Sequence, residues 1–271
     1  FKSDYGLKLS WHPQFVDGSF GFFLRQFTET KPWAPIMGSS DYHMSYADKV
    51  KLLGVSYETS IGPYSTGFEL SYRKDTALLS SSTPSVSDPQ GREGARGDTL
   101  HFLANTQVSL DKTAFYDTGF AQAEIAYTRL LKKTKNAQMY FGEDNSATCP
   151  AGTKWAGCAT DDSVSVALYV APQWLSVFPG VDIDVPLFAQ YGLYGNSATV
   201  DAANAEGALI YSIGVHALIN QKYNVTLQYN GYESRHKGIV TGPAGDYYAY
   251  SPGVGFLDDR DWVSLSFSTT F

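Results

Sequence analysis

Within the last ten residues of the chain, 262–271, apolar and small polar side chains alternate strictly from 263 to 268. Val263, Leu265 and Phe267 share one face, and the serines between them share the other. A repeat of two is the period of a β-strand with one apolar and one polar face. About ten such residues suit a strand of a transmembrane β-barrel, although a strand of a soluble β-sandwich has the same pattern. The rest of the chain decides between these folds.

The same alternation recurs along the whole chain and predicts about eleven strands. The connections between them alternate between short and long, as in outer-membrane barrels, which have short periplasmic turns and long extracellular loops. A soluble sandwich has no reason to follow this rule. We therefore predict an all-β fold, a transmembrane antiparallel up-and-down β-barrel that forms a single domain over residues 1–271. Long loops are expected near residues 28–48, 75–97, 131–162, 195–206 and 235–260.

The direction of the strands leads to a prediction about the size of the barrel. The short connection after the first strand, at residues 5–11, places the start of that strand on the outer side. Single-chain bacterial barrels have an even number of strands. An odd count that begins outside therefore predicts that this chain is the C-terminal part of a larger, even-stranded barrel. One strand overlooked within residues 28–48 or 131–162 would overturn this prediction.

Composition agrees with a membrane barrel and excludes other classes. The chain has no apolar run of roughly 18 residues, which a transmembrane helix needs. Charged residues make up 17% of the chain, against about 25% in soluble domains. The net charge of −7 and the lack of a basic stripe argue against a nucleic-acid partner. Aromatic residues at the short-turn ends of the strands are expected to form an interfacial girdle: Trp11, Phe15, Tyr64, Phe115, Tyr116, Trp174, Phe178, Tyr223 and Phe271.

The aromatic end of the last strand resembles the sorting signal of bacterial outer-membrane barrels. Val263, Leu265, Phe267 and Phe271 would form this membrane insertion signal. The chain departs from the pattern at Thr269, where the signal usually has an aromatic residue. We therefore expect the protein in the bacterial outer membrane, in contact with outer-membrane lipid and lipopolysaccharide.

Three stretches resemble the proteobacterial proteins grouped as domain-of-unknown-function family 1302. They are GSFGFFLRQF at 18–27, YADKVKLLGVSY at 46–57, continuing to ELSYR at 69–73, and DDRDWVSLSF at 258–267. The resemblance covers most of this chain and the C-terminal half of the family. It implies an outer-membrane protein with three kinds of partner: an envelope lipoprotein-like protein, a resistance-nodulation-division exporter and a small hydrophobic ligand. The family has no established catalytic residues to carry over.

Polar side chains on the inward face of the strands are candidates for lining the lumen. They either tune what passes, as charged rings do in pores, or pair with one another and hold the wall rigid. The candidates are Lys8, Arg25, Glu58, Glu69, Arg73, His101, Glu124, Asp182, Asp184, Gln190, His216 and Gln228.

The sequence predicts no metal, no cofactor and no enzyme. Asp182 and Asp184 share a face, but two carboxylates alone are a weak signal for a cation. His101 and His216 lack an identifiable third ligand. Ser212 shares a face with His216 without any spacing that marks a catalytic set. The acidic residues of the outer rim leave a calcium site and a solvated turn open: Asp258, Asp259 and Asp261.

The chain has two cysteines, Cys149 and Cys158, and both lie in one expected outer loop. Cysteines in an extracytoplasmic loop pair readily. We predict a disulfide that stabilises this loop by about 2–3 kcal/mol in the chain-entropy model.

Three functions remain open. The first is a channel or transporter for hydrophobic or aromatic small molecules. The alternative is a non-transporting barrel that docks an exporter-linked envelope complex, and the third is a general porin. The Gly/Tyr-rich segment 238–256 is either a lid folded into the mouth or a surface epitope; aromatic side chains suit apolar ligands.

Overall fold

The computed structural model describes residues 4–33, 36–37, 42–43, 45–80, 93–200, 205–235, 239–241, 247–249 and 257–269. Twelve strands form one antiparallel sheet. They are β1 (Tyr5–Trp11), β2 (Ser19–Phe27), β5 (Val50–Ile61), β6 (Tyr64–Ala77), β7 (Arg96–Leu110), β8 (Thr118–Lys135), β9 (Asp162–Phe178), β10 (Val181–Asp184), β11 (Leu187–Tyr194), β12 (Ala208–Ile219), β13 (Tyr223–Ser234) and β16 (Trp262–Thr269). Neighbouring strands follow one another along the chain, except that β10 and β11 lie in line and both pair with β9 and β12. This confirms the all-β, antiparallel, up-and-down prediction.

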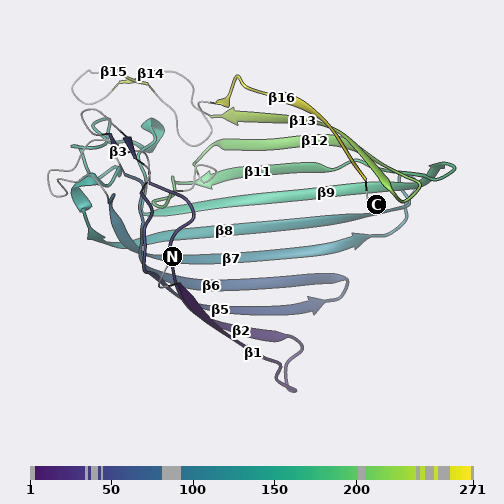
Figure 1. The fold of residues 1–271 in the computed structure, drawn as a ribbon, viewed down its shortest axis with the longest axis horizontal. Helices are drawn as coiled ribbons and strands as arrows, with labels where there is room; N and C mark the ends of the chain where they lie inside the picture. Colours follow the sequence, from purple (N-terminus) through teal and green to yellow (C-terminus); the bar gives the residue numbers. More distant parts are fainter. Residues whose placement is uncertain are drawn as a thin grey trace.

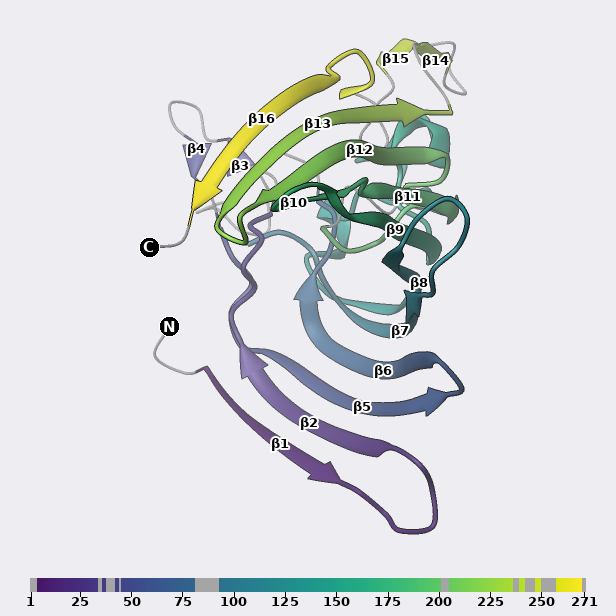
Figure 2. The same ribbon diagram turned by 90° about the vertical axis from the view of Figure 1, so that its right-hand side faces the viewer.

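The sheet curls into a trough whose two edges are β1 and β16 (Figure 2). The described residues contain no hydrogen-bonded pairing between these two strands. The long connections gather at one end of the trough and the short turns at the other (Figure 1). In the described part of the chain, no helix is sufficiently long and apolar to cross a membrane.

The strand count differs from the prediction at one place. The alternation of residues 182–191 predicts one strand, but the structure interrupts it at Val185–Pro186, which separates β10 from β11. Proline has no N–H to donate to the ladder. The pairing continues on both sides, because Val185 N–H donates to Pro172 and Gly214 N–H donates to Pro186, at 3.0 and 2.9 Å. Since β10 and β11 both pair with β9 and β12, they make one crossing of the sheet.

The described parts of the long loops add no crossing strand. Within 28–48 lie β3 (Ile36–Met37) and β4 (Tyr42–His43), which pair only with each other. The connection from β8 to β9 contains two 3₁₀ turns, η1 (Ala137–Met139) and η2 (Lys154–Ala156). In the part of the chain described, the sheet therefore has the eleven crossings that the sequence predicted. A further hairpin, β14 (Ile239–Thr241) with β15 (Tyr247–Ala249), lies apart from the sheet.

Apolar side chains form a continuous outer face across the sheet. Cross-strand pairs join Leu9 to Phe22, Phe22 to Val55, Val55 to Leu70, and Leu70 to Phe102. Large apolar side chains on this face are exposed, up to 74% for Leu265 on β16. The residues between these, at alternate positions along each strand, form the inner face, where hydroxyl, amide and charged side chains predominate. The period of two therefore predicted both faces correctly.

The buried core lies among the long connections rather than in the sheet. We call this region the loop dome: residues 27–33, 45–50, 77–80, 94–97, 137–161 and 195–206, as far as they are described. One cluster packs around Leu78, Leu130 and Tyr140, and another around Trp33 and Val50. The loops expected at 75–97 and 131–162 are shorter than predicted, because strands β6 to β9 run into the dome.

The disulfide prediction is confirmed inside the dome. Cys149 and Cys158 are joined, with Cα atoms 5.9 Å apart, and both are buried. Their bridge closes the segment that contains η2, next to the cluster around Tyr140 and Ala159.

Removing both cysteines, as Cys149→Ala/Cys158→Ala, should destabilise the dome by about 2–3 kcal/mol, because the unfolded loop regains its conformational freedom. Limited proteolysis should then cut between residues 137 and 161 while strands β1 to β16 stay protected. The unchanged protein should take up maleimide only after reduction. Labelling without a reductant would contradict the prediction.

Candidate functional site

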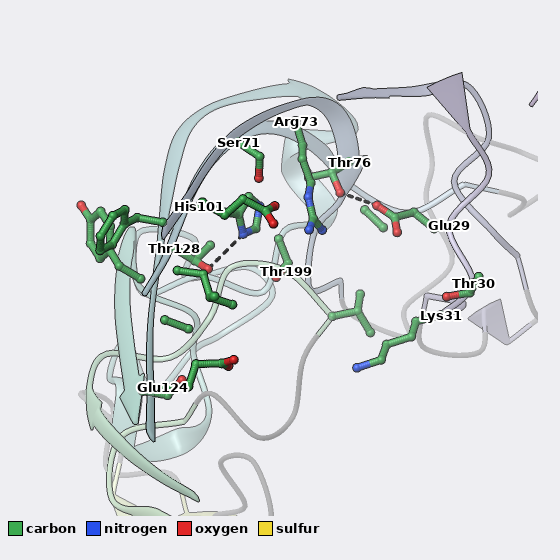
Figure 3. A pocket seen from close by; sticks show the side chains of 18 of the residues that line it. Glu29, Thr30, Lys31, Ser71, Arg73, Thr76, His101, Glu124, Thr128 and Thr199 are labelled. Carbon is green, nitrogen blue, oxygen red and sulfur yellow. Dashed lines mark hydrogen bonds between the residues drawn. The ribbon is translucent and has the colours of Figure 1, made fainter. Parts of the chain in front are cut away.

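A cavity of about 410 Å³ lies between the inner face of the sheet and the loop dome (Figure 3). Its wall is built by β6, β7, β8, β9 and β11, and its cover by residues 29–31 and 199–200. Five predicted lumen residues line it: Glu69, Arg73, His101, Glu124 and Gln190. The sequence alone did not indicate the covering segments, which show no strand alternation.

The register of the strands brings these side chains onto one wall. Ser71 on β6 pairs with His101 on β7, and His101 pairs with Thr128 on β8. Both ring nitrogens of His101 are occupied: Nε2 lies 2.8 Å from Thr99 Oγ1, and Nδ1 lies 3.1 Å from Thr128 Oγ1. His101 is thus held by hydroxyl groups, and its ring is a fixed part of the cavity wall.

Arg73 presents its charge to this cavity (Figure 3). Within the described residues, its Nε is buried without a hydrogen-bond partner, and no ion pair includes its guanidinium. Lys31, on the loop opposite, extends its ammonium group into the same space. The nearby carboxylate of Glu29 accepts a hydrogen bond from Thr76 Oγ1 at 2.5 Å.

A second cavity of about 390 Å³ continues along the inner face toward the short turns. It shares Glu124, Ser165 and Gln190 with the first cavity, so the two form one track. Two further members of its wall are aromatic, Tyr169 on β9 and Phe188 on β11, which pair directly across the strands. The track therefore offers charged groups near the dome and an aromatic surface below them.

Tyr169 and Phe188 were not among the predicted site residues. Both residues fall at strand positions that point to the inner face, and this was the signal in the sequence that could have identified them. Aromatic side chains on the polar face of a barrel strand are exceptions to its pattern, and such exceptions point to a surface for ligands. Phe120 on β8 extends this surface, with its ring centre 6.4 Å from that of Tyr169.

Four other predicted lumen residues lie away from the track. Glu58 lines a more open cavity of about 760 Å³ nearer the short turns. Lys8 lies over the ring of Phe23 at 5.3 Å, and Arg25 lies over Phe27 at 4.6 Å. Gln228 Nε2 donates to Asn230 Oδ1 at 2.7 Å.

The remaining candidates are Asp182, Asp184 and His216, which form wall contacts near the short turns. His216 Nδ1 lies 2.5 Å from Asp184 Oδ1, and its Nε2 lies 3.0 Å from Asn224 Oδ1. Asp182 accepts hydrogen bonds from Ser176 N–H and from the side chain of Gln221. The two aspartates thus serve different partners and do not converge on one ion.

Metal sites are absent from the described part of the chain, where no three His, Cys, Asp or Glu side chains converge. At the outer rim, Asp258 and Asp261 accept the backbone N–H groups of Ser234 and Tyr232, at 2.8 and 3.1 Å. Asp259 is exposed, and its Oδ1 lies 3.8 Å from Nε of Arg260. The rim carboxylates therefore hold the turn before β16.

Two predicted features lie outside the described residues. The first is the C-terminal Phe271 of the membrane insertion signal, whereas Val263, Leu265 and Phe267 are described and exposed on the outer face. The second is the lid or epitope of 238–256, of which only the backbone of β14 and β15 is placed.

An ion pair fastens two long connections of the dome together. Lys154 Nζ lies 2.5 Å from Glu206 Oε2, and both side chains are largely buried. Burial alone would raise the pKa of Glu206. Hydrogen bonds from Lys154 and from Gly195 N–H, with the charges of Lys154 and Arg235, outweigh burial and hold this pKa below its ordinary value.

The lowered pKa predicts that acid loosens this part of the dome. A group with a depressed folded-state pKa stabilises the fold above its unfolded value, about 4.3 for Glu, and this contribution is lost as the pH falls through the folded pKa. Hydrogen exchange at residues 195–196, corrected for intrinsic rates, should therefore speed up below about pH 4.3. Glu206→Gln should exchange faster at pH 7 and change less on acidification; an equal acid response in that variant would refute the assignment.

The comparisons with known proteins place residues 2–271 within one family model, described as a protein of unknown function (DUF1302). No curated protein matches the chain, and no solved structure matches it.

Proposed function

Because this chain belongs to the DUF1302 family, whose description states no activity, we propose a function from its geometry: it forms the wall of an outer-membrane β-barrel that conducts small molecules with a hydrophobic or aromatic body. The observation that carries the proposal is the two-faced sheet, apolar outside and lined inside by a continuous track of cavities. We propose no catalytic role.

The outer face supports insertion in a bilayer. In water, a face that exposes large apolar side chains on consecutive strands invites aggregation, whereas lipid removes that cost. The predicted girdle adds to this argument, because Trp11, Phe15, Phe115 and Phe178 are exposed at the short-turn end. Interfacial aromatic belts of this kind flank the apolar band of membrane barrels.

The parity of the sheet supports a larger barrel. With eleven crossings, β1 and β16 run in the same direction, so closing this sheet on itself would require a parallel pair. Antiparallel closure needs an odd number of further strands between the two edges. We propose that such strands complete an even-stranded barrel, as the sequence suggested.

The track of cavities favours conduction over docking. A barrel that serves only as a docking partner has no need of open space, whereas cavities of about 410 and 390 Å³ lie end to end along the inner face. Tyr169 and Phe188 suit an aromatic or apolar solute better than the ions and sugars of a general porin. The proposed partners are membrane lipid and lipopolysaccharide, an envelope lipoprotein-like protein and a resistance-nodulation-division exporter.

Two measurements test this function. The intact mass of the protein extracted from outer membranes should exceed the 29.7 kDa of this chain if further strands come from the same polypeptide. A deletion strain should accumulate a labelled neutral aromatic compound at a changed rate and regain the original rate on complementation. Unchanged accumulation, with high ion conductance in a planar bilayer, would replace the proposal with a general porin.

A further inference from the structure

We propose that Arg73 binds the carboxylate of the conducted molecule. The ligand of the first cavity, the one under the loop dome that we call the upper cavity, is then a monocarboxylic acid with an apolar body. This inference deepens the proposed function. It rests on that function only in treating the bound molecule as one that is conducted, because binding itself can be measured without transport.

The first argument is the unmet bonding of Arg73. Its Nε is buried and without a hydrogen-bond partner, and among the described residues no carboxylate forms an ion pair with it. Arg73 as a whole is half-buried, but this donor atom is shielded from water, and a buried donor of a charged group that stays unpaired is costly. A guanidinium presents its donors in a planar fork that matches a carboxylate through two parallel hydrogen bonds. A ligand carboxylate would accept hydrogen bonds from the guanidinium and balance its positive charge.

The second argument is the surroundings of the guanidinium. Lys31 extends a second positive charge into the same cavity from the covering loop (Figure 3). Hydroxyl groups line the same cavity from both sides, Ser71 from the wall and Thr199 from the cover, and can donate to a carboxylate oxygen. The carboxylate of Glu29 lines the same end and accepts the hydroxyl of Thr76, but it keeps its negative charge. Because the two cations, the guanidinium and Lys31, outnumber this one anion, this end of the cavity is suited to one negatively charged head group.

The third argument limits the ligand to one carboxylate. Glu69 lies four residues from Arg73 on the same strand and face, about 13 Å away along the strand, and Glu124 lies farther down the track. These carboxylates would repel a second anionic group. Between the two ends the wall offers Leu103 and Ala126, and the cover offers Val200. An apolar body suits this middle part.

The test is equilibrium dialysis of the detergent-solubilised full-length protein with 4-phenylbutyrate and with its uncharged amide, against a detergent-only blank. The unchanged protein should bind the carboxylate at least about tenfold more tightly than the amide, because hydrogen bonds to charged groups contribute on that scale. Arg73→Gln should abolish this preference. Lys74→Gln removes a positive charge from the neighbouring exposed position of β6 and should keep it.

Three results would overturn the proposal. The first is equal affinity of the unchanged protein for carboxylate and amide, which also decides the matter if Arg73→Gln fails to assemble. The second is an equal loss of affinity for 4-phenylbutyrate and for its amide in Arg73→Gln, which would make Arg73 a structural residue. The third is displacement of phenylbutyrate by inorganic phosphate at equal concentration, which would mean that the apolar body takes no part. Absence of uptake in cells would count against conduction and leave the binding result standing.

Discussion

Replacing Leu265 with Arg should prevent the protein from assembling in the outer membrane. Leu265 lies in the middle of β16, pairs with Leu227, and is 74% exposed on the outer face. Each Arg or Lys facing lipid near the bilayer midplane costs about 2–4 kcal/mol. Heat-modifiable migration in SDS gels and protease resistance of outer-membrane fractions should both be lost.

The neighbouring residue provides the control. Ser266 pairs with Thr226 on the inner face of the same strand, and it is also exposed. Ser266→Arg adds the same side chain one position away, but on the inner face of the sheet, so assembly should be retained. If Leu265→Arg assembled as well as Ser266→Arg, the outer face would not contact lipid, and the membrane proposal would fall.

Replacing Trp33 with Ala should open the loop dome. Trp33 is 1% exposed, packs with Phe27 and Val50, and donates from Nε1 to the carbonyl of Ala95 at 3.1 Å. Truncating a buried Trp typically costs about 3–5 kcal/mol. Because Trp33 follows the segment that covers the upper cavity, the variant should also admit solutes faster.

Hydrogen exchange measures this effect where it is expected. Amides of Glu29, Trp33 and residues 94–97 should lose protection, while those in the middle of β8 should keep it. Trp33→Phe retains a ring and loses the hydrogen bond to Ala95. Its loss of amide protection should therefore lie between that of the unchanged protein and that of Trp33→Ala. Trp11→Ala, at an exposed position of the opposite end, should leave the dome unchanged. Uniform loss of protection in Trp33→Ala would mean that dome and sheet unfold together.

The sheet was predictable because its determinants are local. Side chains alternate faces at every residue, so the sequence of β16 alone indicates which side of the strand is apolar. The break at Val185–Pro186 was overlooked, since the alternation continues across it and only the missing N–H of proline signals it. Strand ends were also misplaced, because β8 continues to Lys135 with charged residues that an outer-face pattern does not include.

The dome was not predictable because its contacts join distant segments without any period. Trp33 bonds to Ala95, and Leu79 N–H bonds to the carbonyl of Ala198. Only the disulfide could be predicted, since the chain has two cysteines and thus one possible pair within it. The site was predictable only in part. The alternation of faces indicated Arg73 and His101 as inner-face residues, whereas the cavity could not be predicted because it forms where the dome covers them.

The position of the core has a consequence for how this chain tolerates mutation. Outer-face residues such as Leu265 meet no complementary protein surface here, so exchange among Leu, Ile, Val and Phe should change the stability of the protein very little. Dome residues fit one another, and a change at Tyr140 requires a matching change at Leu78 or Leu130. The usual expectation that loops vary and strands are constrained should therefore be reversed in a deep mutational scan, with the long connections forming the less permissive part.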